Sequence, residues 1–138
     1  ISLVHAYPIS IEWEPPHLSK LPAVAECRQL IREKFGLAEN VRLCVGVERL
    51  DYTKGILDRL NALDELLTLH PEWIGKVAFL QIAAPSRGTL PAYQQLYEEC
   101  LRHAEDINER HGRENYTPVV LVTEHHSQTE VYEIYRAA

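Results

Sequence analysis

The chain has 138 residues, of which 46% are hydrophobic and 25% charged, which is typical of one folded globular domain and excludes a disordered or fibrous protein. Its net charge of −6 at pH 7 argues against a broad electrostatic surface for nucleic acid or an anionic membrane. Its apolar runs are far shorter than the ~18–20 residues of a membrane span, and no secretory signal pattern opens the chain. Any anion is therefore expected to be bound by a few local cations.

The cysteines indicate a reducing compartment. Cys27, Cys44 and Cys100 are widely spaced, and each lies in an apolar stretch. Buried free thiols are therefore favoured over a disulfide framework or a zinc site. We expect a cytoplasmic protein. Because the chain begins with Ile1 and reaches Ala138 within a helical pattern, we also expect a fragment of a longer protein.

The apolar pattern in the first part of the chain alternates between strand and helix signals. Residues 3–11 alternate apolar positions around Pro8, which suits an edge strand. Residues 23–35 have apolar positions at helical spacing, and Gly36 after them is a favourable C-terminal cap. Residues 41–47 are nearly all apolar and β-branched, as expected of a strand covered on both faces of a parallel sheet.

The same alternation continues to the end of the chain. Residues 56–67 carry a leucine-rich helical stripe, and residues 77–83 repeat the composition of a buried strand. A long amphipathic helix is predicted over 91–111, a strand over 118–122 and a last helix capped by Ser127. Regular strand and helix alternation predicts the α/β class, with a Rossmann-like parallel sheet and helices on both faces.

In such sheets ligands bind beyond the carboxyl ends of the strands, which directs attention to residues 48–55, 84–88 and 123–127. The first of these loops, ERLDYTKG, places Arg49 and Lys54 before a helix start. Two cations beside the free N–H groups of a helix N-terminus can bind a phosphate or diphosphate. The loop matches neither a Walker loop nor a dinucleotide fingerprint. From spacing alone, an anion site and a solvated surface loop remain equally open.

Three segments resemble a known enzyme family. Residues 45–55, VGVERLDYTKG, resemble the V-G-V-(D/E)-R-L-D-Y-(S/T)-K-G segment of trehalose-6-phosphate synthases, which are retaining glycosyltransferases of the GT-B fold. Residues 81–88, QIAAPSRG, are similar to the family's Q-I-A-x-x-S-R-G turn, and residues 7–11, YPISI, to its Y-P-I-G-I. The resemblance implies that residues 1–138 are a partial nucleotide-sugar-binding domain, without the N-terminal acceptor domain and the downstream donor loop.

The resemblance also implies residue roles and a reaction. Arg49 and Lys54 would hold the diphosphate of the donor UDP-glucose and stabilise it as it leaves. Arg87 would bind the phosphate of the acceptor glucose 6-phosphate, and the backbone at or near His126 would contact the nucleotide. Glucose would be transferred with retention in trehalose biosynthesis, without a cofactor, a catalytic metal, a nucleic acid or a membrane. The isolated chain is expected to be inactive, since it would need the rest of its parent chain.

Several alternatives stay open at this stage. Asp51 is expected to cap the helix or orient Arg49 rather than act as a catalytic carboxylate, and Arg87 could instead pair with an acidic neighbour. A metal at His125 and His126 is disfavoured because adjacent residues rarely converge on one ion. The rival functions are a glucosylglycerol-phosphate synthase and a non-catalytic sugar-phosphate sensor. The donor nucleotide (UDP, ADP or GDP), a homo-oligomeric state and an attached phosphatase domain are left undecided.

Overall fold

The computed structural model describes residues 3–10, 18–85 and 90–138. Three strands in this part of the chain form one parallel sheet in the order β1-β2-β3. The strands are β1 (Arg42–Arg49), β2 (Val77–Ala84) and β3 (Val119–Val122). The α-helices are α1 (Val24–Phe35), α2 (Ile56–Leu69), α3 (Pro91–His111) and α4 (Gln128–Ala137), and short 3-10 helices are η1 (Leu18–Lys20), η2 (Tyr52–Lys54) and η3 (Pro71–Trp73).

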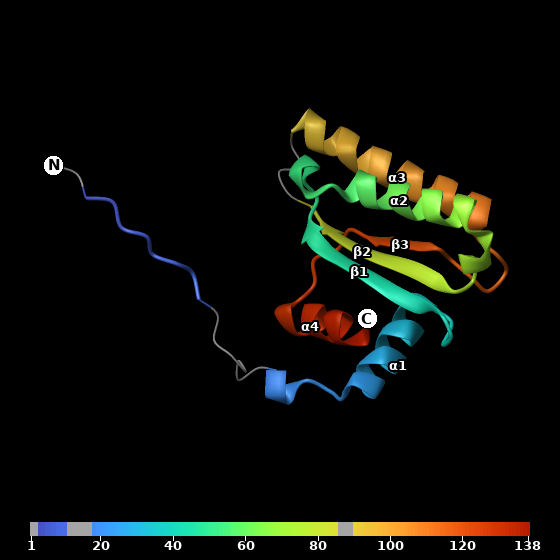
Figure 1. Cartoon of the computed structure of the whole chain (residues 1–138), viewed down its shortest axis with the longest axis horizontal. Helices are drawn as coiled ribbons and strands as arrows, with labels where there is room; N and C mark the ends of the chain where they lie inside the picture. The colour runs from blue at the N-terminus through green and yellow to red at the C-terminus, as the bar shows by residue number, and fades with distance from the viewer. Residues whose placement is uncertain (1–2, 11–17, 86–89) are drawn as a thin grey trace.

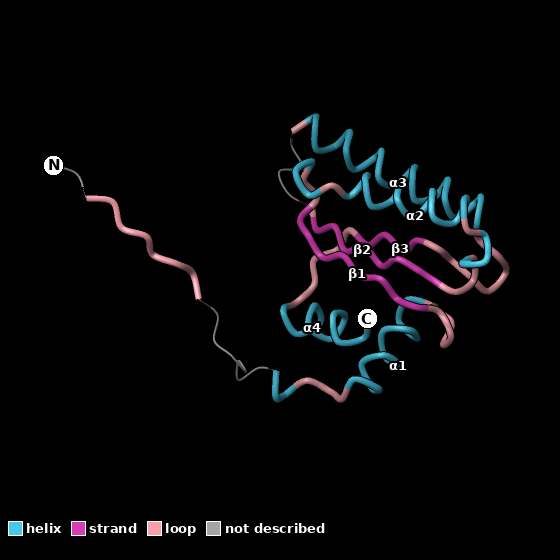
Figure 2. Tube along the Cα trace, in the orientation of Figure 1, coloured by secondary structure: helices cyan, strands magenta, loops and turns pink. Residues whose placement is uncertain are grey.

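The helices cover both faces of the sheet. Helices α2 and α3 pack on one face, and α1 and α4 pack on the other (Figure 1, and by element type in Figure 2). Successive strand residues point to opposite faces, so Phe79 contributes to the core under α2 and α3, while Leu80 and Ile82 contribute to the core over α1 and α4. The predicted α/β class with helices on both faces is confirmed.

The predicted element ends agree closely with the structure. Gly36 ends α1 in the left-handed conformation at φ 63°, which glycine adopts without steric cost. Ser127 caps α4 and forms a reciprocal capping box with Glu130. The long helix spans Pro91–His111, as the apolar spacing predicts. No helix among the described residues is both long enough and apolar enough to cross a membrane.

Strand β1 departs from its prediction because it lies at the edge of the described sheet. Strand β2 is buried from Val77 to Ala83, but Arg42 and Cys44 on β1 are exposed. The helices therefore cover β1 only in part, and the expectation that Cys44 is buried is wrong. Cys27 and Cys100 are buried free thiols, as predicted. Burial raises the pKa of Cys100 to about 11, so this thiol is protonated and unreactive at neutral pH.

The edge strand predicted over residues 3–11 is wrong for the described residues 3–10. These residues form no strand, and the side chains of Val4 and Ile9 are 95% and 98% exposed. Alternating apolar residues stabilise a strand only when a neighbouring strand binds its backbone and a core covers one of its faces. Neither is provided by the described part of the chain.

A carboxylate links α2 to α3 through a buried histidine. Nε2 of His111 lies 2.7 Å from Oδ1 of Asp64, and Arg110 donates to the other carboxylate oxygen. Burial by itself would raise the pKa of Asp64, but the hydrogen bonds from His111 and Arg110 outweigh it and the pKa lies below its ordinary value. A lowered pKa in the folded state means that the ionised carboxylate stabilises the fold.

We therefore expect Asp64→Asn to reduce the free energy of unfolding at pH 7 by about 1–3 kcal/mol. The difference from the wild type should shrink as the pH falls below about 4, because the unfolded state then takes up a proton at Asp64, and it should vanish once the pH passes the lower pKa of the folded state. Urea unfolding of both proteins between pH 7 and pH 3 measures this difference in the free energy of unfolding. Asp106→Asn, an exposed change on α3, is the control. A difference that is the same at every pH would contradict this role for the Asp64 charge.

Candidate functional site

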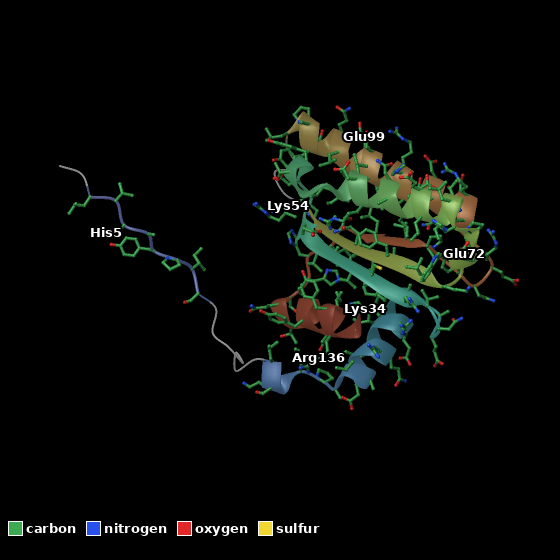
Figure 3. The ribbon with its side chains drawn as sticks, viewed as in Figure 1. His5, Lys34, Lys54, Glu72, Glu99 and Arg136 are labelled. Carbon is green, nitrogen blue, oxygen red and sulfur yellow. The ribbon has the colours of Figure 1, made fainter. Side chains whose placement is uncertain are left out.

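The loops that follow the strands meet at one edge of the sheet. Arg49, the last residue of β1, is paired with Ala84, the last residue of β2, and β3 runs parallel beside them. Figure 3 shows Lys54 at this carboxyl edge and Glu72 at the opposite edge. Residues 48–55 and 123–127 therefore lie at the edge where ligands of such sheets bind.

Asp51 organises the turn that carries Lys54. Its Oδ1 accepts hydrogen bonds from the Thr53 backbone N–H at 2.9 Å and the Thr53 hydroxyl at 2.8 Å, and the Tyr93 hydroxyl donates to Oδ2 at 3.3 Å. The bond from the Thr53 backbone contributes most to lowering the pKa of Asp51. Asp51 is therefore the N-cap of the short helix η2 and not of α2, the helix it was predicted to cap, and its carboxylate is engaged within the loop.

Gly55 connects this turn to α2. Its φ of 62° lies in the left-handed region, and it both ends η2 and precedes the first turn of α2. It offers no side chain to cap α2, and no side chain of the described residues forms a cap hydrogen bond there. The N-terminal N–H groups of this 14-residue helix, with its dipole, are therefore available to an anion.

Arg49 and Lys54 are the two cations of this loop. Both are exposed, and neither forms an ion pair with a carboxylate of the described residues. Arg49 ends β1 and Lys54 ends η2 just before α2, so both residues lie at the carboxyl edge of the sheet. Two positive charges without an ion pair to a described carboxylate are suited to bind an external anion.

Beneath the loop lies a polar network that the sequence reasoning did not assign. Arg59 on α2 contacts Glu48 on β1, Gln81 on β2 and the carbonyl oxygen of Lys54. The signal was present in the sequence, since Gln81 interrupts an otherwise apolar strand and a buried amide requires hydrogen-bond partners.

A cavity opens at the same edge of the sheet. It has a volume of about 460 Å³ and is lined by residues that follow all three strands and by α3, among them Leu50, Pro85, Tyr93 and Thr123. A larger hollow of about 760 Å³ runs along α1 and includes none of the loops that follow the strands. Position relative to the strand ends, and not size, makes the first cavity the better candidate.

Of the other two predicted site residues, His126 is among the described residues and Arg87 is not. His126 is half-buried in the loop between β3 and α4, and its Nδ1 lies 3.1 Å from the carbonyl oxygen of Glu124. Its backbone thus stands at the same edge as Lys54. Arg87 lies outside the described residues, so its role rests on the sequence.

The described residues define an α/β domain with two exposed cations, Arg49 and Lys54, at the carboxyl ends of its parallel strands. The family is found by comparison: residues 2–138 match the model of Glycosyltransferase family 20. The chain belongs to this family.

Individual relatives support the assignment to this family. The chain is 43% identical over 117 residues to the UDP-forming α,α-trehalose-phosphate synthase of Botryotinia fuckeliana, an alignment that covers 84% of this chain and 22% of the relative. A solved structure from E. coli, described as trehalose-6-phosphate bound with UDP-2-fluoro glucose, matches with a TM-score of 0.71 and 33% identity. The match covers 90% of this chain and 25% of that one.

A third match is a UDP-forming α,α-trehalose-phosphate synthase from Burkholderia xenovorans in complex with glucose-6-phosphate. It has a TM-score of 0.70 and 27% identity, and the match covers 83% of this chain and 27% of that one. The chain spans about a quarter of the length of the curated relatives it matches.

Proposed function

We propose that this chain is the nucleotide-sugar-binding part of a longer trehalose-6-phosphate synthase, the parent enzyme. In this proposal it belongs to the C-terminal domain of a GT-B glycosyltransferase that transfers glucose from UDP-glucose to glucose 6-phosphate with retention. The observation that carries the proposal is the exposed pair Arg49 and Lys54, without internal carboxylate partners, at the end of β1 in a member of this family.

The chemistry of the transfer explains why cations are needed there. When the anomeric C–O bond breaks, negative charge accumulates on the departing diphosphate. Arg49 would offer a planar fork of donors and Lys54 a compact charge, with the N-terminus of α2 beside them. Charges held in place before the reaction stabilise the transition state more than the ground state. The departing phosphate oxygen would take the proton of the acceptor, so no nucleophile is required from this chain.

The remaining assignments concern the two substrates and the setting. Arg87 would bind the phosphate of glucose 6-phosphate, and the backbone at His126 would contact the nucleotide. The bound molecules of the E. coli and B. xenovorans structures support this pair of substrates. The buried free thiols Cys27 and Cys100 fit a cytoplasmic enzyme, and a homo-oligomer of the parent enzyme is compatible with the proposal.

The test is an assay of the parent enzyme with a panel of donors and acceptors. UDP-, ADP- and GDP-glucose are each combined with glucose 6-phosphate or a glycerol phosphate, and products are identified by NMR. We expect trehalose 6-phosphate with the α,α configuration and UDP. Turnover with the glycerol phosphate alone would favour a glucosylglycerol-phosphate synthase. Binding of glucose 6-phosphate without turnover of any donor would favour a sensor.

A further inference from the structure

We propose that Arg59 is a positioning residue of the proposed donor site. It fixes the turn that carries Lys54, and Glu48 and Gln81 in turn fix Arg59. The inference rests on the proposed function for the identity of the anion that Lys54 binds, whereas the mechanical role of Arg59 is argued from the contacts alone.

The guanidinium of Arg59 joins three elements of the fold. Nη2 donates to the carbonyl oxygen of Lys54 at 2.7 Å. Nη1 donates to Oε1 of Gln81 at 3.1 Å and lies 2.8 Å from Oε1 of Glu48. The rigid, planar guanidinium can make these bonds at once, whereas a lysine ammonium is a single point of charge. The turn is thus tied to β1 and β2 through one side chain.

Gln81 and Glu48 hold the guanidinium in place. Gln81 is fully buried, and its Nε2 donates to Oε2 of Glu48 at 2.7 Å and to the carbonyl oxygen of Ile82 at 2.9 Å. Glu48 thereby bonds to both Gln81 and Arg59, which closes a ring of three side chains. A buried amide is costly when unpaired, so Gln81 favours keeping its bonds to the partly exposed Glu48 and Arg59.

Gly46 leaves the space that the ring occupies. A Cβ atom at this position would lie 2.5 Å from Oε1 of Gln81 and 2.8 Å from Nη1 of Arg59. Both distances are shorter than carbon and polar atoms tolerate, so any side chain at position 46 would displace the ring. The absence of a side chain at position 46 of β1 therefore allows Arg59 to take its observed position.

The ring fixes the backbone of Lys54, from which the exposed side chain extends. The Lys54 N–H donates to the carbonyl oxygen of Asp51 at 3.0 Å, and the Lys54 carbonyl accepts from Arg59. Both backbone polar groups of Lys54 are thus bonded, although its side chain is exposed. Glu48 offsets the charge of Arg59, so the ring adds little net charge. Its contribution is to hold Lys54 in position before the anion arrives.

The first test is a double-mutant cycle in the parent enzyme. We expect Lys54→Met to lower kcat/KM for UDP-glucose about 10²-fold and Arg59→Met to lower it about 10-fold or more. The double variant should fall no more than about 3-fold below Lys54→Met, because Arg59 acts through Lys54. Arg59→Lys should not restore activity. Multiplied losses in the double variant, or full rescue by lysine, would show a direct charge effect and overturn the proposal.

The second test needs no substrate. In Arg59→Met, amide hydrogen exchange across residues 51–56 should be about 10-fold faster or more, while exchange in α3 stays as in the wild type. Arg102→Met, which changes an exposed arginine on α3, is the matched control and should alter neither. An unchanged rate at residues 51–56, or faster exchange throughout the domain, would overturn the positioning role. A wild-type enzyme that does not use UDP-glucose would refute the proposed function separately.

Discussion

Replacing Lys54 or Arg49 with alanine in the parent enzyme should each lower kcat by about 10²-fold or more, the scale of losing one preorganised donor to developing negative charge. Both side chains are exposed and lack carboxylate partners among the described residues, so their removal breaks no internal ion pair. The loss should therefore appear in turnover at saturating UDP-glucose, with the folded state retained. Steady-state kinetics together with a thermal unfolding curve for each variant measures this.

The chain offers a matched control for this experiment. Lys76 is also an exposed lysine, but it precedes β2 and so lies at the amino edge of the sheet, opposite the proposed site. Lys76→Ala should leave kcat unchanged. Wild-type turnover in both Lys54→Ala and Arg49→Ala would refute the assignment of the leaving-group site.

Arg87→Ala should raise the KM for glucose 6-phosphate by about 10- to 100-fold, the effect of losing a charge-assisted bond to a phosphate. UDP-glucose binding should change little, because Arg49 and Lys54 hold the donor in this proposal. Initial rates at varied acceptor and fixed donor, together with UDP binding by calorimetry, separate the two effects. Arg102→Ala is the control. A loss of UDP affinity without a change in the acceptor KM would instead place Arg87 on the donor.

The described elements were largely predictable because their signals are local. The apolar stripe of α2, the C-terminal glycine of α1 and the capping serine of α4 act within one or two helical turns. The parallel sheet followed from regular alternation of strands and helices, and its carboxyl edge followed from the sheet. Arg49 and Lys54 could therefore be located before any contact was known.

Predictions that depended on a neighbour in space fared less well. Residues 3–10 alternate as a strand does, but the described chain pairs no strand with them. Cys44 lies in an apolar run, but β1 is at an edge and is only partly covered. In both cases the local pattern was read correctly, and exposure was decided by which other elements lie beside the segment.

The amino-acid sequence by itself determined the class of fold, the family and the cations at the end of β1, because periodicity and a contiguous motif record them. Only the tertiary structure decided that Arg59, Glu48 and Gln81 form a ring, and that Gly46 leaves room for it. These residues are 2 to 35 positions apart along the chain. They meet because parallel pairing sets Gly46 opposite Gln81 and α2 crosses over them. A hydrogen bond depends on distance in space, which no single segment of the sequence encodes.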